Sequence, residues 1–159
     1  MKLTKVIVYI VLLSITIGFE IPSKPTENMF VVGVDELKDV RVSEPFVITG
    51  YVKNESKKSW DLSFGAGLFT YELYDKSGNI VKTDAEMLFR NDIGYSTKIG
   101  PGEVYRNNGE EHRSREFYQY TIQHPGIYKV RTTAEFNVVD NNQEYKFIVS
   151  SKFFEFVVK

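Results

Sequence analysis

Short segments in which apolar and polar residues alternate recur along the chain from residue 29 onward. In the clearest segment, 127–136, the even-numbered residues are Tyr, Val, Thr, Ala and Phe, and the odd-numbered ones are Ile, Lys, Arg, Thr and Glu. Successive side chains of a strand point to opposite faces, so a period of two predicts strands with one buried face. Strands are expected at 30–34, 46–52, 60–64, 68–74, 103–106, 117–122, 127–136, 145–149 and 153–158, the first of them at a sheet edge.

Turn residues separate these segments. Asp75-Lys76-Ser77-Gly78 predicts a tight turn, because Gly78 takes a positive φ without strain, and Ile80-Val81 then completes a hairpin over 68–82. The small residues at 65–67 predict a bulge or corner. Further turns or loops are expected at 53–56, 91–97, 99–102, 107–115, 124–126 and 138–142, whereas 84–90 fits either a helical turn or a strand.

The alternating pattern determines the expected fold class. Each strand has one apolar face, and burying a large side chain is worth roughly 1.5–3 kcal/mol. A single sheet would leave those faces in water, so two sheets must stack. We therefore predict an all-β, immunoglobulin-like antiparallel β-sandwich of about eight or nine strands over residues 29–159.

The N-terminus predicts export. Residues 1–5 are short and basic, and an apolar run follows at 6–19. Fourteen residues of helix rise roughly 21 Å, whereas a bilayer core is about 30 Å thick. Residues 1–18 are therefore predicted to be a signal peptide cleaved after Gly18, with an uncleaved membrane anchor as the first alternative and a buried core segment as the last.

Both leading alternatives place the domain outside the cytoplasm, either secreted or tethered to the membrane. Membrane contact is expected only through 6–19, and only if the leader is uncleaved. Residues 19–28 carry Pro22 and Pro25 among polar residues, which predicts an extended tether.

Composition narrows the functional classes. The 159-residue chain has no cysteine, which excludes disulfides, thiolate catalysis and cysteine-ligated metals. Its net charge is −1, and removal of the leader, with Lys2 and Lys5, would make it more acidic. Nucleic-acid binders usually carry a basic surface, so no nucleic-acid partner is expected.

A family resemblance extends over about residues 47–136. It rests on Asn54, the Phe and small-Gly corner at 62–67, the strand and turn at 71–81, Gly100-Pro101-Gly102-Glu103, and the Pro-Gly-Ile-Tyr-Lys-Val stretch at 125–130. Together these residues resemble the Bacillus intracellular proteinase inhibitor (BsuPI) domain family. The resemblance implies an immunoglobulin-like sandwich and a protease-inhibiting activity, and no inhibitory residue is carried over.

We predict no catalytic residue, cofactor or metal. Glu110-Glu111-His112 would point to opposite faces of a strand, and the acidic residues 84, 86 and 92 lack the spacing of a calcium loop. The sequence has no Gly-x-Ser-x-Gly nucleophile elbow, and 65–67 lacks the Lys and helix of a phosphate loop. The aromatic residues Trp60, Phe64, Phe69 and Tyr71 are predicted to be core, with a carbohydrate-stacking platform as the alternative.

Two long loops supply the candidate binding surface, since loops at the ends of a sandwich commonly carry recognition. Arg and Tyr are favoured anchor residues at interfaces. The candidate residues are Tyr95, Lys98, Arg106, Arg113 and Arg115. We predict an exported, non-enzymatic binding module for a protein or cell-envelope ligand, with a protease inhibitor as its sharpest form. The alternative is a structural or accessory envelope domain without inhibitory activity.

Overall fold

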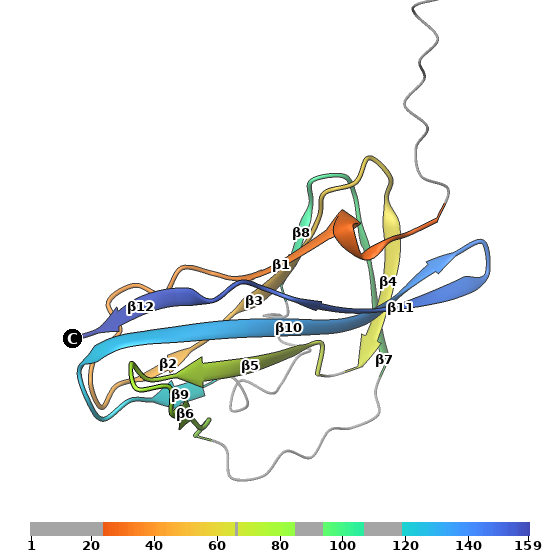
Figure 1. Ribbon diagram of the computed structural model, residues 1–159. Helices are drawn as coiled ribbons and strands as arrows, with labels where there is room; N and C mark the ends of the chain where they lie inside the picture. Colours follow the sequence, from red (N-terminus) through yellow and green to blue (C-terminus); the bar gives the residue numbers. More distant parts are fainter. Residues whose placement is uncertain (1–23, 66, 85–93, 107–118) are drawn as a thin grey trace, which may run out of the picture.

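The computed structural model describes residues 24–65, 67–84, 94–106 and 119–159 (Figure 1). These residues form a short 3-10 helix, Glu27–Met29, and antiparallel β-sheets, which confirms the predicted all-β sandwich. The small sheet has the order β1 (Phe30–Val34), β3 (Gly50–Asn54) and β8 (Val104–Arg106), so β1 is an edge strand as predicted. A two-stranded sheet pairs β2 (Pro45–Val47) with β9 (Gln119–Thr121).

The large sheet is organised around one long strand, β10 (Gly126–Asp140) (Figure 1). The strands along one edge of β10 are β5 (Phe69–Tyr74) and β4 (Trp60–Gly65), with β6 (Ile80–Val81) and β7 (Gly94–Ile99) outside them. The strands along its other edge are β12 (Phe154–Val158) and β11 (Gln143–Ser150). A strand of fifteen residues is about 50 Å long, so β10 spans the sheet from end to end.

A bulge between β11 and β12 changes which side chains face outward. Thr133 pairs with Ser150 and Val130 with Phe154, so three steps along β10 oppose four steps along its neighbour, leaving one extra residue. The Thr132 N–H donates to Ser151 Oγ over 3.0 Å, and the Ser151 N–H donates to the Thr132 carbonyl over 2.8 Å. An extra residue reverses the alternation of a strand. Even-numbered residues of β11 therefore face outward, whereas in β12 the odd-numbered ones do.

The core lies against the inward face of β10, where Tyr128, Val130, Thr132, Ala134, Phe136 and Val138 are buried. One core cluster surrounds Trp60 and Phe136, and a second surrounds Tyr120 and Phe156. Thr132 is polar and fully buried, and its Oγ1 donates to the Thr70 carbonyl over 3.2 Å. Residues 60, 64 and 69 are buried and Tyr71 is half-buried, so the predicted core role of these aromatic residues is confirmed.

Asn54 is the second buried polar residue of the described core. Its Nδ2 donates to the carbonyls of Lys58 (2.7 Å), Ile99 (3.1 Å) and Gly100 (3.1 Å), and its Oδ1 accepts from the backbone and hydroxyl of Ser56. These hydrogen bonds satisfy the buried amide of Asn54, and they hold the segments at 56–58 and 99–100 against the end of β3. Glycine is required nearby at Gly50, because a Cβ there would lie 2.7 Å from the Tyr71 hydroxyl.

Several predicted boundaries are corrected. The single strand expected at 46–52 is divided into β2 and β3, which belong to different sheets. The turn expected at 138–142 is shorter, because β10 continues to Asp140 and a two-residue hairpin turn follows, with Asn141 and Asn142 at φ 50° and 61°. The hairpin at 68–82 is confirmed, with Gly78 at φ 85°.

The first residues of the domain lie inside the predicted tether. Pro25 is buried and the 3-10 helix begins at Glu27, so the folded part starts before residue 29. The predicted leader 1–18 and residues 19–23 lie outside the described residues. The undecided segment 84–90 is described only at Asp84. Among the described residues, no helix has the length and apolar character needed to cross a bilayer.

Candidate functional site

The structure does not place the predicted binding residues Tyr95 and Lys98 in a loop. Both belong to β7, because the segment 94–97 pairs with β4 and is not the expected loop. Tyr95 is half-buried and stacks on Phe64 with 6.1 Å between ring centroids, whereas Lys98 is exposed and lies opposite Asp61. Side chains an odd number of positions apart on a strand face opposite sides, so these two residues cannot share one surface.

Arg106 lies on β8 of the small sheet. Its Nε donates to Asp35 Oδ2 over 2.7 Å and Oδ1 over 3.0 Å, and its guanidinium lies 5.8 Å from the Tyr51 ring. The hydrogen bond to Asp35 raises the pKa of Arg106 above its usual value. Arg113 and Arg115 lie outside the described residues. Arg106 is therefore a paired residue of a strand, and the described residues do not bring the predicted set together.

Most of the acidic and histidine residues from which a metal site could be built, 86, 92 and 110–112, also lie outside the described residues. Asp84 is described, and its carboxylate accepts from the Thr121 backbone N–H (2.8 Å) and hydroxyl (2.7 Å). Within the described ranges, no three His, Asp or Glu side chains come together as a metal site would require.

An open hollow of about 490 Å³ lies beside β5, β6 and β9. Its lining is Tyr71, Ile80, Val81, Lys82, Thr83, Asp84 and Tyr120. Tyr120 is the most deeply buried titratable group of this lining, and desolvation raises the pKa of its phenol to about 12. A phenol that stays protonated at neutral pH is not poised for general base chemistry.

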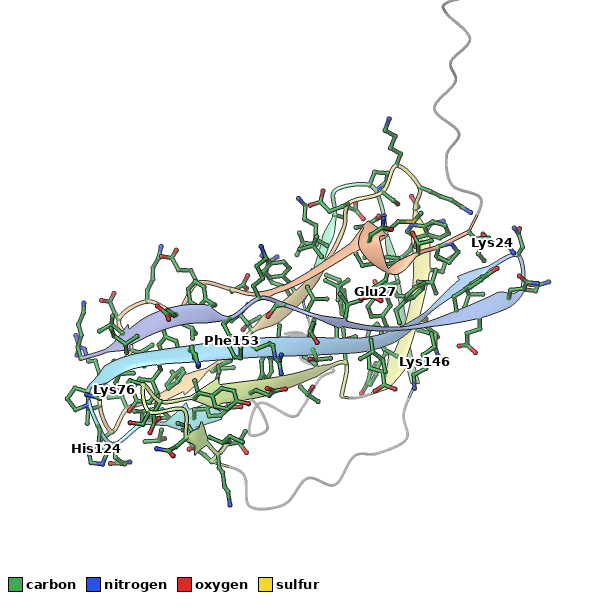
Figure 2. All side chains as sticks on the ribbon, viewed as in Figure 1. Lys24, Glu27, Lys76, His124, Lys146 and Phe153 are labelled. Carbon is green, nitrogen blue, oxygen red and sulfur yellow. The ribbon has the colours of Figure 1, made fainter. Side chains whose placement is uncertain are left out.

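The outward face of the large sheet carries the more prominent feature, a group of exposed apolar side chains. Ile80 is 67% exposed, Ile127 and Val157 are each 54% exposed, and Phe153 is 45% exposed. Figure 2 shows Phe153 beside β10. Large apolar residues gathered on one face mark interaction surfaces more often than singly scattered ones do.

Strand register brings these side chains together. Ile127 lies opposite Val157, and Lys129 lies opposite both Glu155 on β12 and Tyr74 on β5. Tyr74 in turn lies opposite Ile80 on β6. The cluster thus crosses four neighbouring strands. We call Tyr74, Ile80, Ile127, Lys129, Phe153 and Val157 the Phe153 patch.

Aromatic rings and cations interleave in the patch. The rings of Tyr74 and Phe153 meet edge to face, with 5.8 Å between centroids. Lys129 Nζ lies 5.7 Å from the Tyr74 ring and 5.1 Å from the Phe153 ring, and the Arg131 guanidinium lies 5.1 Å from Phe153. A cation within about 6 Å of a ring centroid is attracted by the ring quadrupole, so these contacts favour the observed packing of the rings against the cations.

One ion pair borders the patch. Arg131 Nη2 donates to Glu72 Oε2 over 2.7 Å and Oε1 over 2.9 Å, and the Tyr74 hydroxyl donates to Oε2 over 2.9 Å. The hydrogen bond from Tyr74, followed by that from Arg131, lowers the pKa of Glu72, and the same bond raises the pKa of Tyr74. The charge of Arg131 is thereby balanced. Lys129 has ring contacts and no carboxylate partner among the described residues.

Sequence reasoning missed this patch although part of its signal was visible. The alternation over 127–136 places Ile127 on the same face as Lys129 and Arg131, so an apolar residue occupies the polar face. Phe153 and Val157 gave no such signal, because the bulge at Ser151 decides which way they face.

Comparison with known proteins gives no family. No family model matches the chain, and no curated protein matches it. Among solved structures, the chain is similar to a beta-glucuronidase of Bacteroides uniformis, with 14% identity over 81% of this chain and a TM-score of 0.28. The match covers 15% of that enzyme's chain. A likeness this weak carries no argument about fold or activity.

Proposed function

We propose that the chain is a non-catalytic binding domain that contacts a protein partner through the Phe153 patch. The observation that carries the proposal is the exposure of Ile127, Phe153 and Val157 on one sheet face, bordered by Lys129 and Arg131. Protein interfaces combine an apolar centre with Tyr, Phe and Arg anchors. The patch has these residue types on paired strands, whose backbone is already ordered before binding.

The proposal includes an extracytoplasmic location, which rests on the predicted leader at 1–18. Lys24, where the described chain begins, lies at the opposite end of the sheet from Lys76 and His124 (Figure 2). The β10 residues of the patch, Ile127 and Lys129, follow His124 closely along the chain, after Pro125 and Gly126. A domain anchored through its N-terminus would hold these residues away from the membrane and toward a partner.

The sharpest form of the proposal is a protease inhibitor, and it rests on the BsuPI resemblance. Its test is titration of an extracellular serine protease with the full chain. Loss of protease activity at a one-to-one ratio of chain to protease supports the inhibitor form of the proposal. Proteolysis of the chain with unchanged activity contradicts it and leaves the wider binding role to be judged separately.

A matched set of variants tests the binding role. The full chain, the double variant I127A/F153A and the control V139A/I148A serve as bait for extracytoplasmic extracts. Val139 and Ile148 are exposed apolar residues of the same sheet face, at its other end. We expect one protein to bind the wild type and the control and to be lost with I127A/F153A. Equal capture by all three, or capture by none, contradicts the proposal.

A further inference from the structure

We infer that the β10–β12 side of the Phe153 patch, with Ile127, Lys129, Phe153 and Val157, binds the same residues of a second copy of this chain, as a two-fold symmetric dimer. The inference rests on the proposed function, because it names the partner of the same surface. Three properties of the patch support it: its position on a sheet face, its strand register and its balance of charge.

The shape of the patch fits another sheet. Ile127, Lys129, Glu155 and Val157 lie opposite each other on two paired strands, so their side chains share one face of the sheet. Flat apolar sheet faces pack against each other about 10 Å apart. Each copy of the chain supplies one such face, and an isologous contact needs no other surface.

The register places complementary residues opposite each other. Ile127 pairs with Val157 and Lys129 with Glu155 across the β10–β12 ladder. Consider a two-fold axis that runs parallel to these strands, above the line midway between them and halfway between the two facing sheets. Rotation about this axis places β10 of the second copy over β12 of the first copy, and β12 over β10. Ile127 then faces Val157 of the second copy, Lys129 faces Glu155 of the second copy, and each contact occurs twice.

The charge of the surface permits this self-association. Glu72, Lys129, Arg131 and Glu155 contribute two negative and two positive charges, so the net charge is zero. A surface of one sign would repel its own copy. Arg131 and Glu72 neutralise each other, whereas Lys129 and Glu155 have no ion-pair partner within 4.0 Å among the described residues. These two unpaired groups are the ones that the axis brings together.

The contact is confined to one end of the sheet. Toward the other end the outward groups already pair within the chain, since Lys146 Nζ lies 2.6 Å from Glu135 Oε1 and the hydroxyls of Thr133 and Ser150 lie 2.7 Å apart. Sheets twist, so two faces in contact at one end diverge along the strands. The polar end therefore stays in water.

Cross-linking tests the arrangement, because the chain has no cysteine of its own. Full chains with I127C are mixed with full chains with V157C and treated with a short thiol-reactive cross-linker. A linker is needed because facing sheets lie about 10 Å apart and a disulfide needs closer Cα atoms. We expect the I127C and V157C chains to cross-link about 10-fold faster than chains of the control mixture of V139C and E144C. Val139 and Glu144 are paired and exposed at the other end of the sheet. Equal rates overturn the inference.

Charge reversal provides an independent test. K129E and E155K each place like charges opposite each other twice, so each should weaken dimerisation by about 10-fold or more in sedimentation experiments. The double variant K129E/E155K restores opposite charges and should recover most of the affinity. Thermal unfolding at low concentration verifies that all three variants fold. If the single variants weaken dimerisation and the double variant does not restore it, the arrangement is contradicted.

The failure of this inference can be told from the failure of the proposed function. A wild-type chain that remains monomeric at every concentration overturns the dimer. If a protein other than this chain binds the wild type but not I127A/F153A in the bait experiment, the patch is a binding surface for that protein. If the two capture the same proteins, the proposed function fails as well.

Discussion

The two halves of the outward face of β10 lie on one strand, yet they differ in chemistry. In the half at 127–131, Ile127 is exposed beside Val157 and the cations lie over Tyr74 and Phe153. In the half at 133–139, outward groups pair with polar partners, as Glu135 does with Lys146. The apolar residues Val139 and Ile148 there lie opposite Glu144 and Glu135.

The inward face beneath both halves is uniformly apolar apart from Thr132. The fold therefore makes the same demand on both halves, and packing of the core does not require exposed apolar residues on either. The polar half shows what the outward face of this sheet needs for stability. Both halves carry exposed aliphatic residues, but only the half at 127–131 adds the aromatic rings Tyr74 and Phe153 with cations over them, and this difference supports the binding role proposed for it.

The largest expected effect distinguishes the inward from the outward face of the sheet. Phe136→Ala removes a buried ring that packs on Phe30 at 5.1 Å, and it should lower the free energy of unfolding by about 3–5 kcal/mol. Phe153→Ala should lower it by about 1 kcal/mol or less. Chemical denaturation measures both. Equal losses would mean that Phe153 belongs to the core and not to a surface.

The next effect separates the two halves of the outward face. Ile127→Ala should weaken self-association about 10-fold, because a truncated aliphatic residue is lost twice in a symmetric contact. Val139→Ala, on the same strand, should leave it unchanged. Sedimentation equilibrium over a range of concentrations gives both constants. An equal effect of the two variants would remove the distinction between the halves.

A smaller effect compares the ion pairs of the two halves. Arg131→Ala removes both the Glu72 pair and the contact with Phe153, and should cost about 1 kcal/mol of unfolding free energy. Glu135→Ala removes a pair whose side chains are 57% and 61% exposed, and should cost less than about 0.5 kcal/mol. Denaturation at low and high salt checks the order, since salt screens the exposed pair more strongly.

The smallest effect is the pH dependence of the Glu72 contribution. The folded pKa of Glu72 lies below its ordinary value of 4.5, so its contribution is present above the unfolded pKa and is lost as the pH falls through the folded pKa. The stability difference between the wild type and Glu72→Gln should therefore be full at pH 6–7 and shrink on acidification below about pH 4. A difference that grows on acidification would contradict the lowered pKa.

Much of the fold could be predicted from local pattern. The alternation over 127–136 correctly identified the inward residues of β10, and Asp75 to Gly78 correctly predicted the hairpin turn. The described part of the predicted loop, 94–97, is a strand instead, because Gly, Tyr, Ser and Thr give no strong apolar period and β7 forms there by pairing with β4. The Phe153 patch was not among the predicted binding residues; of those, Tyr95, Lys98 and Arg106 lie on strands, whereas Arg113 and Arg115 lie outside the described residues, so their predicted binding role stays a prediction.

The sequence by itself determined the period of two, the turns and the burial of one face of each strand, because these depend on neighbouring residues and on the transfer of apolar groups from water. Only the tertiary structure decided the outward surface. The positions of Phe153 and Val157 depend on one extra residue in a ladder, and the meeting of Tyr74, Lys129 and Val157 depends on the register of separate strands. Register and bulges arise from pairing between distant segments, and no local pattern encodes them.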